Sequence, residues 1–98
     1  MSNNGISVGI CTVELYLHGN HSLKGKRQVL KSLKDRVRHK FNVSIAEVGD
    51  VELWQRAQLG IVAVSNDRRY VNTLLTNVIN FIQTASDAEM IDYSIELL

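Results

Sequence analysis

Two apolar runs limit what this chain can fold into more than any other feature. Residues 6–17, ISVGICTVELYL, and residues 58–65, QLGIVAVS, are rich in β-branched and apolar side chains and contain one charge between them, that of Glu14. Neither run reaches the length of about 20 residues that a membrane-spanning helix needs. Short apolar runs of this kind are typical of strands buried in the middle of a sheet. We therefore expect two central strands.

The remaining segments supply two helices and two weaker strands. Residues 22–41, SLKGKRQVLKSLKDRVRHKF, and the segment from the capping cluster at 65–67 to residue 84 repeat apolar side chains at helical spacing. The runs VSIAEV at 43–48 and MIDYSIELL at 90–98 have the character of an edge strand and a half-buried strand. The order βαββαβ predicts an α+β, ferredoxin-like fold. In it, both helices cover one face of a four-stranded antiparallel sheet, with the first and third strands central.

Length and composition narrow the class of protein. We expect a single domain over residues 1–98, with the polar residues 1–5 disordered. No transmembrane span or signal peptide is visible, so a cytoplasmic location without a membrane partner is expected. The only cysteine, Cys11, lies in an apolar run and is expected to be a small buried hydrophobe. We expect neither a metal nor a cofactor, because no zinc-finger spacing is found among Cys11, His18, His21 and His39.

Positive charge is concentrated in the first helix. Eight of the eleven Lys and Arg residues lie in residues 22–41 beside one acid, Asp35, whereas residues 42–98 carry three bases and eight acids. The net charge of +1 therefore hides a dipolar molecule. Five cations recur at spacings of three and four, which places them on one stripe next to the apolar face. We call this set the basic ribbon: Lys24, Arg27, Lys31, Lys34 and Arg38.

Three functions fit these observations. The leading hypothesis is a non-enzymatic accessory protein that contacts RNA or a ribonucleoprotein through the basic ribbon and Lys26. The second is a protein-interaction module, a homodimer through the open sheet face or an edge strand, in which the cations meet an acidic partner or only solvent. The third is a small-anion site, binding or hydrolytic, built from the first amides of the helix with Lys24, Lys26 and Arg27.

Other features bear on partners and on chemistry. Trp54, the only tryptophan, is interpreted first as an anchor that pins its connector to the core, and alternatively as an exposed partner contact. The polar face of the second helix carries no charge, which suggests a partner contact at Asn72, Thr76 and Asn80. No glycine-rich phosphate loop, nucleophile elbow or HExxH motif is present. We therefore expect no catalytic residues and a protein that is not an enzyme.

Three segments resemble a known family. SLKGKRQVLKSL, FNVSIAEV and LWQRAQLGIVAVSND are similar to the YlxP-like family of small bacterial proteins of unknown function, over about Gly9 to Leu97. The resemblance implies a ferredoxin-like fold. The family's genes often lie beside those of translation-initiation and ribosome-maturation factors, which implies work near the ribosome or RNA. It implies no catalytic residue.

Overall fold

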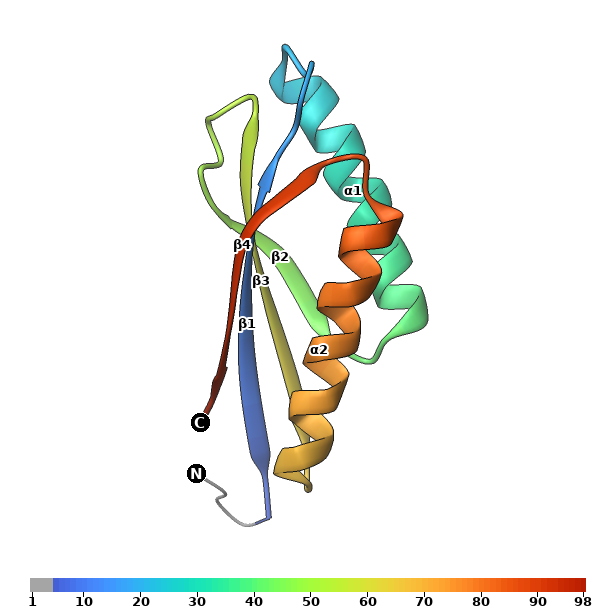
Figure 1. The fold of residues 1–98 in the computed structure, drawn as a ribbon, viewed down its shortest axis with the longest axis vertical. Coiled ribbons are helices and arrows are strands. Elements are labelled where there is room, and N and C mark those ends of the chain that lie inside the picture. The colour runs from blue at the N-terminus through green and yellow to red at the C-terminus, as the bar shows by residue number, and fades with distance from the viewer. Residues whose placement is uncertain (1–4) are drawn as a thin grey trace.

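The computed structural model describes residues 5–98 and forms one sheet covered by two helices (Figure 1). Apart from Gly5, the expected disorder at the N-terminus lies outside the described residues. The sheet is antiparallel throughout, with the order β2-β3-β1-β4, and both helices lie on one face. The ferredoxin-like prediction is therefore confirmed. The elements are β1 (Ser7–Tyr16), α1 (Leu23–Lys40), β2 (Ser44–Gly49), β3 (Arg56–Ser65), α2 (Arg68–Ala85) and β4 (Glu89–Leu97).

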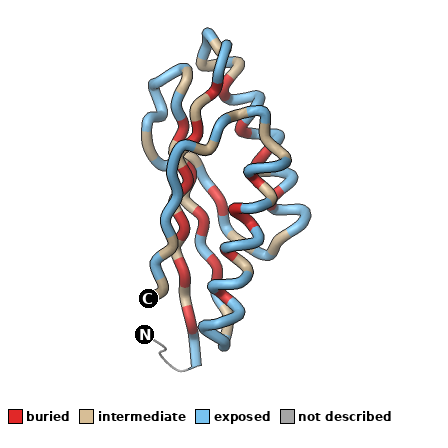
Figure 2. Tube along the Cα trace, viewed as in Figure 1, coloured by how far each residue is buried: buried red, intermediate tan, exposed pale blue. Residues whose placement is uncertain are grey.

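The two faces of the sheet differ in burial because side chains alternate along each strand. In β1 the buried positions include Cys11, Val13 and Leu15, which face the helices, and the intermediate positions face away. In β3, Leu59 and Ile61 are fully buried on the same side. Figure 2 shows these buried positions as red segments on the strands and on the helices that cover them. Alternation along the first apolar run predicts a face toward the helices with Cys11, Val13 and Leu15, and the burial pattern of β1 confirms it.

The two helices cover different parts of the sheet. Helix α2 packs against β1, β3 and β4 through a fully apolar contact surface, and α1 packs against β2 and α2. Both helices begin as expected at polar caps: Ser22 Oγ accepts the amide of Gly25 at 2.9 Å, and the Asp67 carboxylate accepts two amides of α2. No helix in the described part of the chain is both long and apolar enough to cross a membrane.

The connector between β2 and β3 corrects two predictions. Asp50 follows Gly49 and is a residue type that often caps helices, so the sequence predicts one helical turn over residues 51–54. Instead, Asp50 has a positive φ of 58°, and its carbonyl accepts the amide of Leu53 at 3.0 Å, which closes a tight turn. We also favoured a Trp54 packed on the core. Trp54 is 54% exposed and belongs to no core cluster, so it does not pin the connector to the core.

The edge strands are irregular where the central strands are regular. The β2–β3 register shifts between Glu47 and Gly49, so Val48 leaves the pairing and packs over Gly60, where a Cβ would lie 3.0 Å from Val48 Cγ1. Gly60 therefore marks close packing of a neighbour, one of the two roles expected for it. In β4 a second shift leaves Ile91 out of the pairing with β1, and Ile91 is exposed. Tyr93 stays paired with Val13 but is exposed as well, whereas Ile95 and Leu97 are half-buried as expected.

Candidate functional site

The basic ribbon occupies one flank of α1, the flank above the edge strand β2. Arg38 fixes this orientation, because its Nη2 donates to the carbonyl of Ile45 in β2 at 2.9 Å. The opposite flank of the helix carries Arg36, which donates to the carbonyl of Ala85 at the end of α2. Of the five ribbon residues, only Lys34 is half-buried and the others are exposed. The helical spacing thus brings all five together along one side.

One acid partly neutralises the ribbon. Asp35 Oδ2 lies 2.8 Å from Lys31 Nζ, and Asp35 Oδ1 lies 3.5 Å from Arg38 Nη1. The hydrogen bond from Lys31, with the charges of Lys31, Arg38 and Lys34, lowers the pKa of Asp35 below its ordinary value. Such exposed pairs contribute little to stability. Within residues 5–98, the other three cations of the ribbon have no carboxylate at ion-pair distance.

Lys26 is not available to a ligand, which corrects its inclusion among the candidate anion-binding residues. Its side chain is 1% exposed, and Nζ donates to the carbonyls of Asp50 at 2.9 Å, Val51 at 3.1 Å and Arg56 at 3.1 Å. Those three bonds use all three N–H groups of the ammonium. Glu47 Oε2, 2.9 Å away, is therefore held by charge and accepts no hydrogen bond.

The burial of Lys26 has a signal in the sequence. Lys26 precedes Leu30 by four residues and Leu33 by seven, so it belongs to the apolar arc of α1 rather than to the basic ribbon. A long side chain on that arc buries its methylenes and needs acceptors for its charged head. The connector supplies them, so Lys26 ties α1 to the β2–β3 turn.

The start of α1 is already occupied by side chains of its own segment. The Ser22 hydroxyl accepts a hydrogen bond from the amide of Gly25. The Asn20 side chain also lies so close to Gly25 that a Cβ at this position would clash with Asn20 Oδ1. The Asn20 amide in turn donates to the carbonyls of Ser22 and Trp54. The first turn therefore holds the connector in place, and one amide that an anion would use is already bonded.

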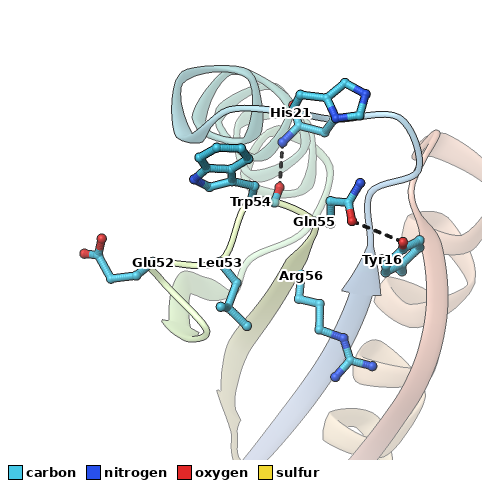
Figure 3. A pocket seen from close by; sticks show the side chains of 8 residues that line it. Tyr16, His21, Glu52, Leu53, Trp54, Gln55 and Arg56 are labelled. Atoms are coloured by element: carbon cyan, nitrogen blue, oxygen red, sulfur yellow. Dashed lines mark hydrogen bonds between the residues drawn. The ribbon is translucent and has the colours of Figure 1, made fainter.

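An open cleft of about 560 Å³ lies beside this junction (Figure 3). Tyr16 at the end of β1 donates from its hydroxyl to Gln55 Oε1 at 3.3 Å. The sequence indicated Trp54 as a contact residue but gave no reason to place it near Tyr16, which is 38 positions away. The strand pairing of Tyr16 with Arg56 brings them together. The lining consists of Tyr16, Asn20, His21, Glu52, Leu53, Trp54, Gln55 and Arg56.

The other suggested contact residues lie elsewhere. Asn72, Thr76 and Asn80 are exposed residues of α2. Figure 1 shows that α2 lies away from the connector between β2 and β3. The Thr76 hydroxyl donates back to the carbonyl of Asn72 at 2.9 Å, and Thr84 donates in the same way to Asn80. Two hydroxyl groups of this uncharged face therefore already have hydrogen-bond acceptors within the helix.

Two groups with reactive chemistry, Cys11 and His18, are buried or paired. Cys11 is fully buried, as expected, and burial raises the pKa of its thiol to about 11, which keeps it protonated at neutral pH. His18 Nε2 lies 2.7 Å from Glu89 Oε1. Among residues 5–98, no group of three or more His, Cys, Asp or Glu side chains is placed to hold a metal ion.

Comparison with known proteins identifies relatives along nearly the whole chain. The model of a family described as a protein of unknown function, DUF503, matches residues 8–95. The uncharacterized protein YlxP of Bacillus subtilis (strain 168) is 42% identical over 82 residues, which cover 84% of this chain and 89% of that protein. Among solved structures, the de novo designed protein Ferredog-Diesel aligns with 98% of this chain and 86% of its own, with a TM-score of 0.45 and 12% identity. The resemblance noted in the sequence is confirmed, and the chain belongs to the DUF503 family of proteins of unknown function.

Proposed function

We propose that this protein is a non-enzymatic accessory protein that binds RNA, alone or in a ribonucleoprotein, through the basic ribbon of α1. The observation that carries the proposal is the separation of cations on this helix. Lys26 serves the fold, Arg36 and Lys40 contact the Phe81 ring at the α2 side, and the five ribbon residues remain on the opposite flank. A surface that gathers one sign of charge attracts the phosphate backbone without reading base sequence.

The dimensions of the ribbon suit a run of phosphates. From residue 24 to residue 38 the helix rises about 21 Å at 1.5 Å per residue. Contact of five cations with five phosphates gives an affinity that falls with log salt at a slope of roughly −3.5 to −4.5. The open face of the sheet is less suitable for RNA, because β1 and β4 bring Glu14 opposite Asp92 there. Two carboxylates at that position repel phosphate.

A matched pair of charge reversals tests the proposal. Lys24→Glu with Arg27→Glu changes two exposed cations at the beginning of α1, and Arg68→Glu with Arg69→Glu makes the same change in net charge at the beginning of α2. Acids are tolerated in the first turns of both helices because of the helix dipole. Fluorescence anisotropy with labelled RNA, at two salt concentrations, should show lost binding for the α1 pair and retained binding for the α2 pair.

Two results would count against RNA binding by this ribbon. Equal loss in both pairs means that only net charge matters, and unchanged binding in the α1 pair means that the ribbon is not the contact surface. Circular dichroism of both variants excludes unfolding as the cause.

Self-association is the second candidate, supported by apolar side chains on the open sheet face. Val62 and Val64 of β3 are 41% and 59% exposed, and Val48 of β2 is 57% exposed. An exposed apolar area of this kind favours contact with another surface. Sedimentation or light scattering of the unmodified protein, and of Val62→Lys with Val64→Lys, would show a dimer that these substitutions dissociate. A monomer at all concentrations rules this candidate out.

A further inference from the structure

We propose that the cleft beside Trp54 is a stacking site for an unpaired base of single-stranded RNA. This inference rests on the proposed function, because it adds a base contact to the phosphate contact of the basic ribbon. The cleft is the part of the surface where an exposed indole, two polar side chains and a cation meet: Trp54, Tyr16, Gln55 and Arg56.

Trp54 is exposed on a segment whose backbone is fixed. Asn20 donates to the Trp54 carbonyl, and Leu17 donates from its amide to the neighbouring Gln55 carbonyl at 2.7 Å. Lys26 holds the carbonyls on either side of this stretch, those of Val51 and Arg56. The indole is therefore presented by an ordered loop, and a ligand that stacks on it pays little entropy for loop ordering.

The cleft has the size and the polar groups for one base. Its volume of about 560 Å³ falls in the range of small-molecule sites. Gln55 offers an amide, and Arg56 offers planar donors and a positive charge. The only acid of the lining, Glu52, points away from the aromatic rings (Figure 3).

The geometry also connects the cleft with the ribbon. Asn20 donates to the backbone carbonyls of Trp54 and of Ser22, the cap of α1, so the backbone that carries the indole is tied to the residue at which that helix begins. A strand whose base lies on Trp54 can thus continue with its phosphates along the ribbon. Paired bases are stacked inside a duplex and cannot reach the indole, so the site selects single strands.

The fluorescence of Trp54 provides a direct measurement, because it is the only tryptophan of the chain. Short single-stranded RNA should quench the emission as it binds, and a duplex of the same length should bind without quenching. In anisotropy titrations Trp54→Leu, which keeps apolar bulk but removes the π-face, should lower affinity for the single strand by roughly tenfold. The same variant should bind the duplex normally, which also shows that its helix surface is intact.

The outcomes separate this inference from the function on which it rests. If single-stranded RNA binds without quenching, or if Trp54→Leu binds it normally, the stacking site is wrong while RNA binding by the ribbon stands. Trp54 is then an exposed anchor for a protein partner. If neither single-stranded nor duplex RNA binds the unmodified protein, the proposed function and the stacking site are both wrong.

Discussion

The two helices have the same length, cover the same side of the sheet and yet are attached in different ways. Helix α2 lies over the central strands and buries only apolar residues: Val71, Leu75, Val78, Ile79 and Ile82. Helix α1 lies over the edge strand and buries three apolar residues and a lysine: Leu30, Leu33, Val37 and Lys26. Helix α1 therefore buries fewer apolar side chains than α2, and it adds a polar contact through Lys26.

This difference explains where charge can gather on the molecule. Each fully buried aliphatic side chain contributes about 1.5–3 kcal/mol, so a helix over the central strands is held best by an apolar surface. A helix at the edge exposes a second flank, which is free to carry cations at little cost. The attachment that α1 lacks in apolar area is supplied by the ammonium of Lys26, which reaches the β2–β3 connector.

The largest expected effect is the loss of that ammonium. Lys26→Met keeps the apolar stem but leaves three carbonyls and the Glu47 carboxylate without their cation. Removing one partner of a buried pair costs about 3–5 kcal/mol, so urea unfolding should show a drop of this size. Lys24→Met, on the exposed side of the same helix, should change stability by less than about 0.5 kcal/mol. Equal stability of the two variants would mean that α1 does not depend on Lys26.

Matched leucine truncations compare the two helices directly. Leu75→Ala in α2 and Leu30→Ala in α1 remove the same atoms from buried sites, and each should cost about 2–5 kcal/mol. Leu75 should lie at the upper end, because the central strands β1 and β3 beneath α2 are each paired on both sides and cannot move to close the cavity. Thermal and urea unfolding give both values. A larger loss at Leu30 would reverse the proposed ranking of the helices.

The close approach of α2 to the sheet gives a smaller effect. A Cβ at Gly9 would lie 2.5 Å from Val71 Cγ1 and 2.8 Å from Leu75 Cδ1, so Gly9→Ala forces α2 outward. Overpacking of this kind costs about 1–3 kcal/mol. Ala63→Gly, which removes a buried methyl group under the same helix layer, serves for comparison. Gly19→Ala is unsuitable as a control, because Gly19 has a positive φ of 73° and the substitution would strain the backbone. An unchanged melting temperature for Gly9→Ala would mean that α2 is not closely seated on β1.

The smallest effect on stability is expected at Asp35. Asp35→Asn removes the acid that pairs with Lys31 and Arg38 and should change the free energy of unfolding very little, because exposed ion pairs are weak. The lowered pKa means that the pairing with Lys31 contributes above the ordinary aspartate pKa and is lost as pH falls through the lowered value. The variant should therefore match the unmodified protein in strong acid. Its RNA affinity should rise at low salt, and an unchanged affinity would show that Asp35 does not shield the ribbon.

The fold was predictable from the pattern of side chains. The apolar runs 6–17 and 58–65 became the central strands, and the capping residues Ser22 and Asp67 begin the two helices. These features are local, because periodicity and capping depend on residues a few positions apart. The connector was not predictable in the same way: the left-handed backbone of Asp50 replaces the expected helical turn.

The candidate site was only partly predictable for the same reason. Helical spacing alone defines the basic ribbon and places Lys26 on the apolar arc of α1, but it does not show which groups accept the charge of that lysine. The cleft at Trp54 depends on strand pairing that joins Tyr16 to Arg56, residues forty positions apart. No local pattern contains that information.

The sequence by itself determined the order of the elements, the covered face of each strand and the flank of α1 on which the cations gather, since all three follow from side-chain period. Only the tertiary structure decided which groups accept the charge of the buried lysine, how the connector turns and what surrounds the tryptophan. Those features depend on contacts between distant segments, where the acceptors for a charge or the neighbours of a ring are set by packing.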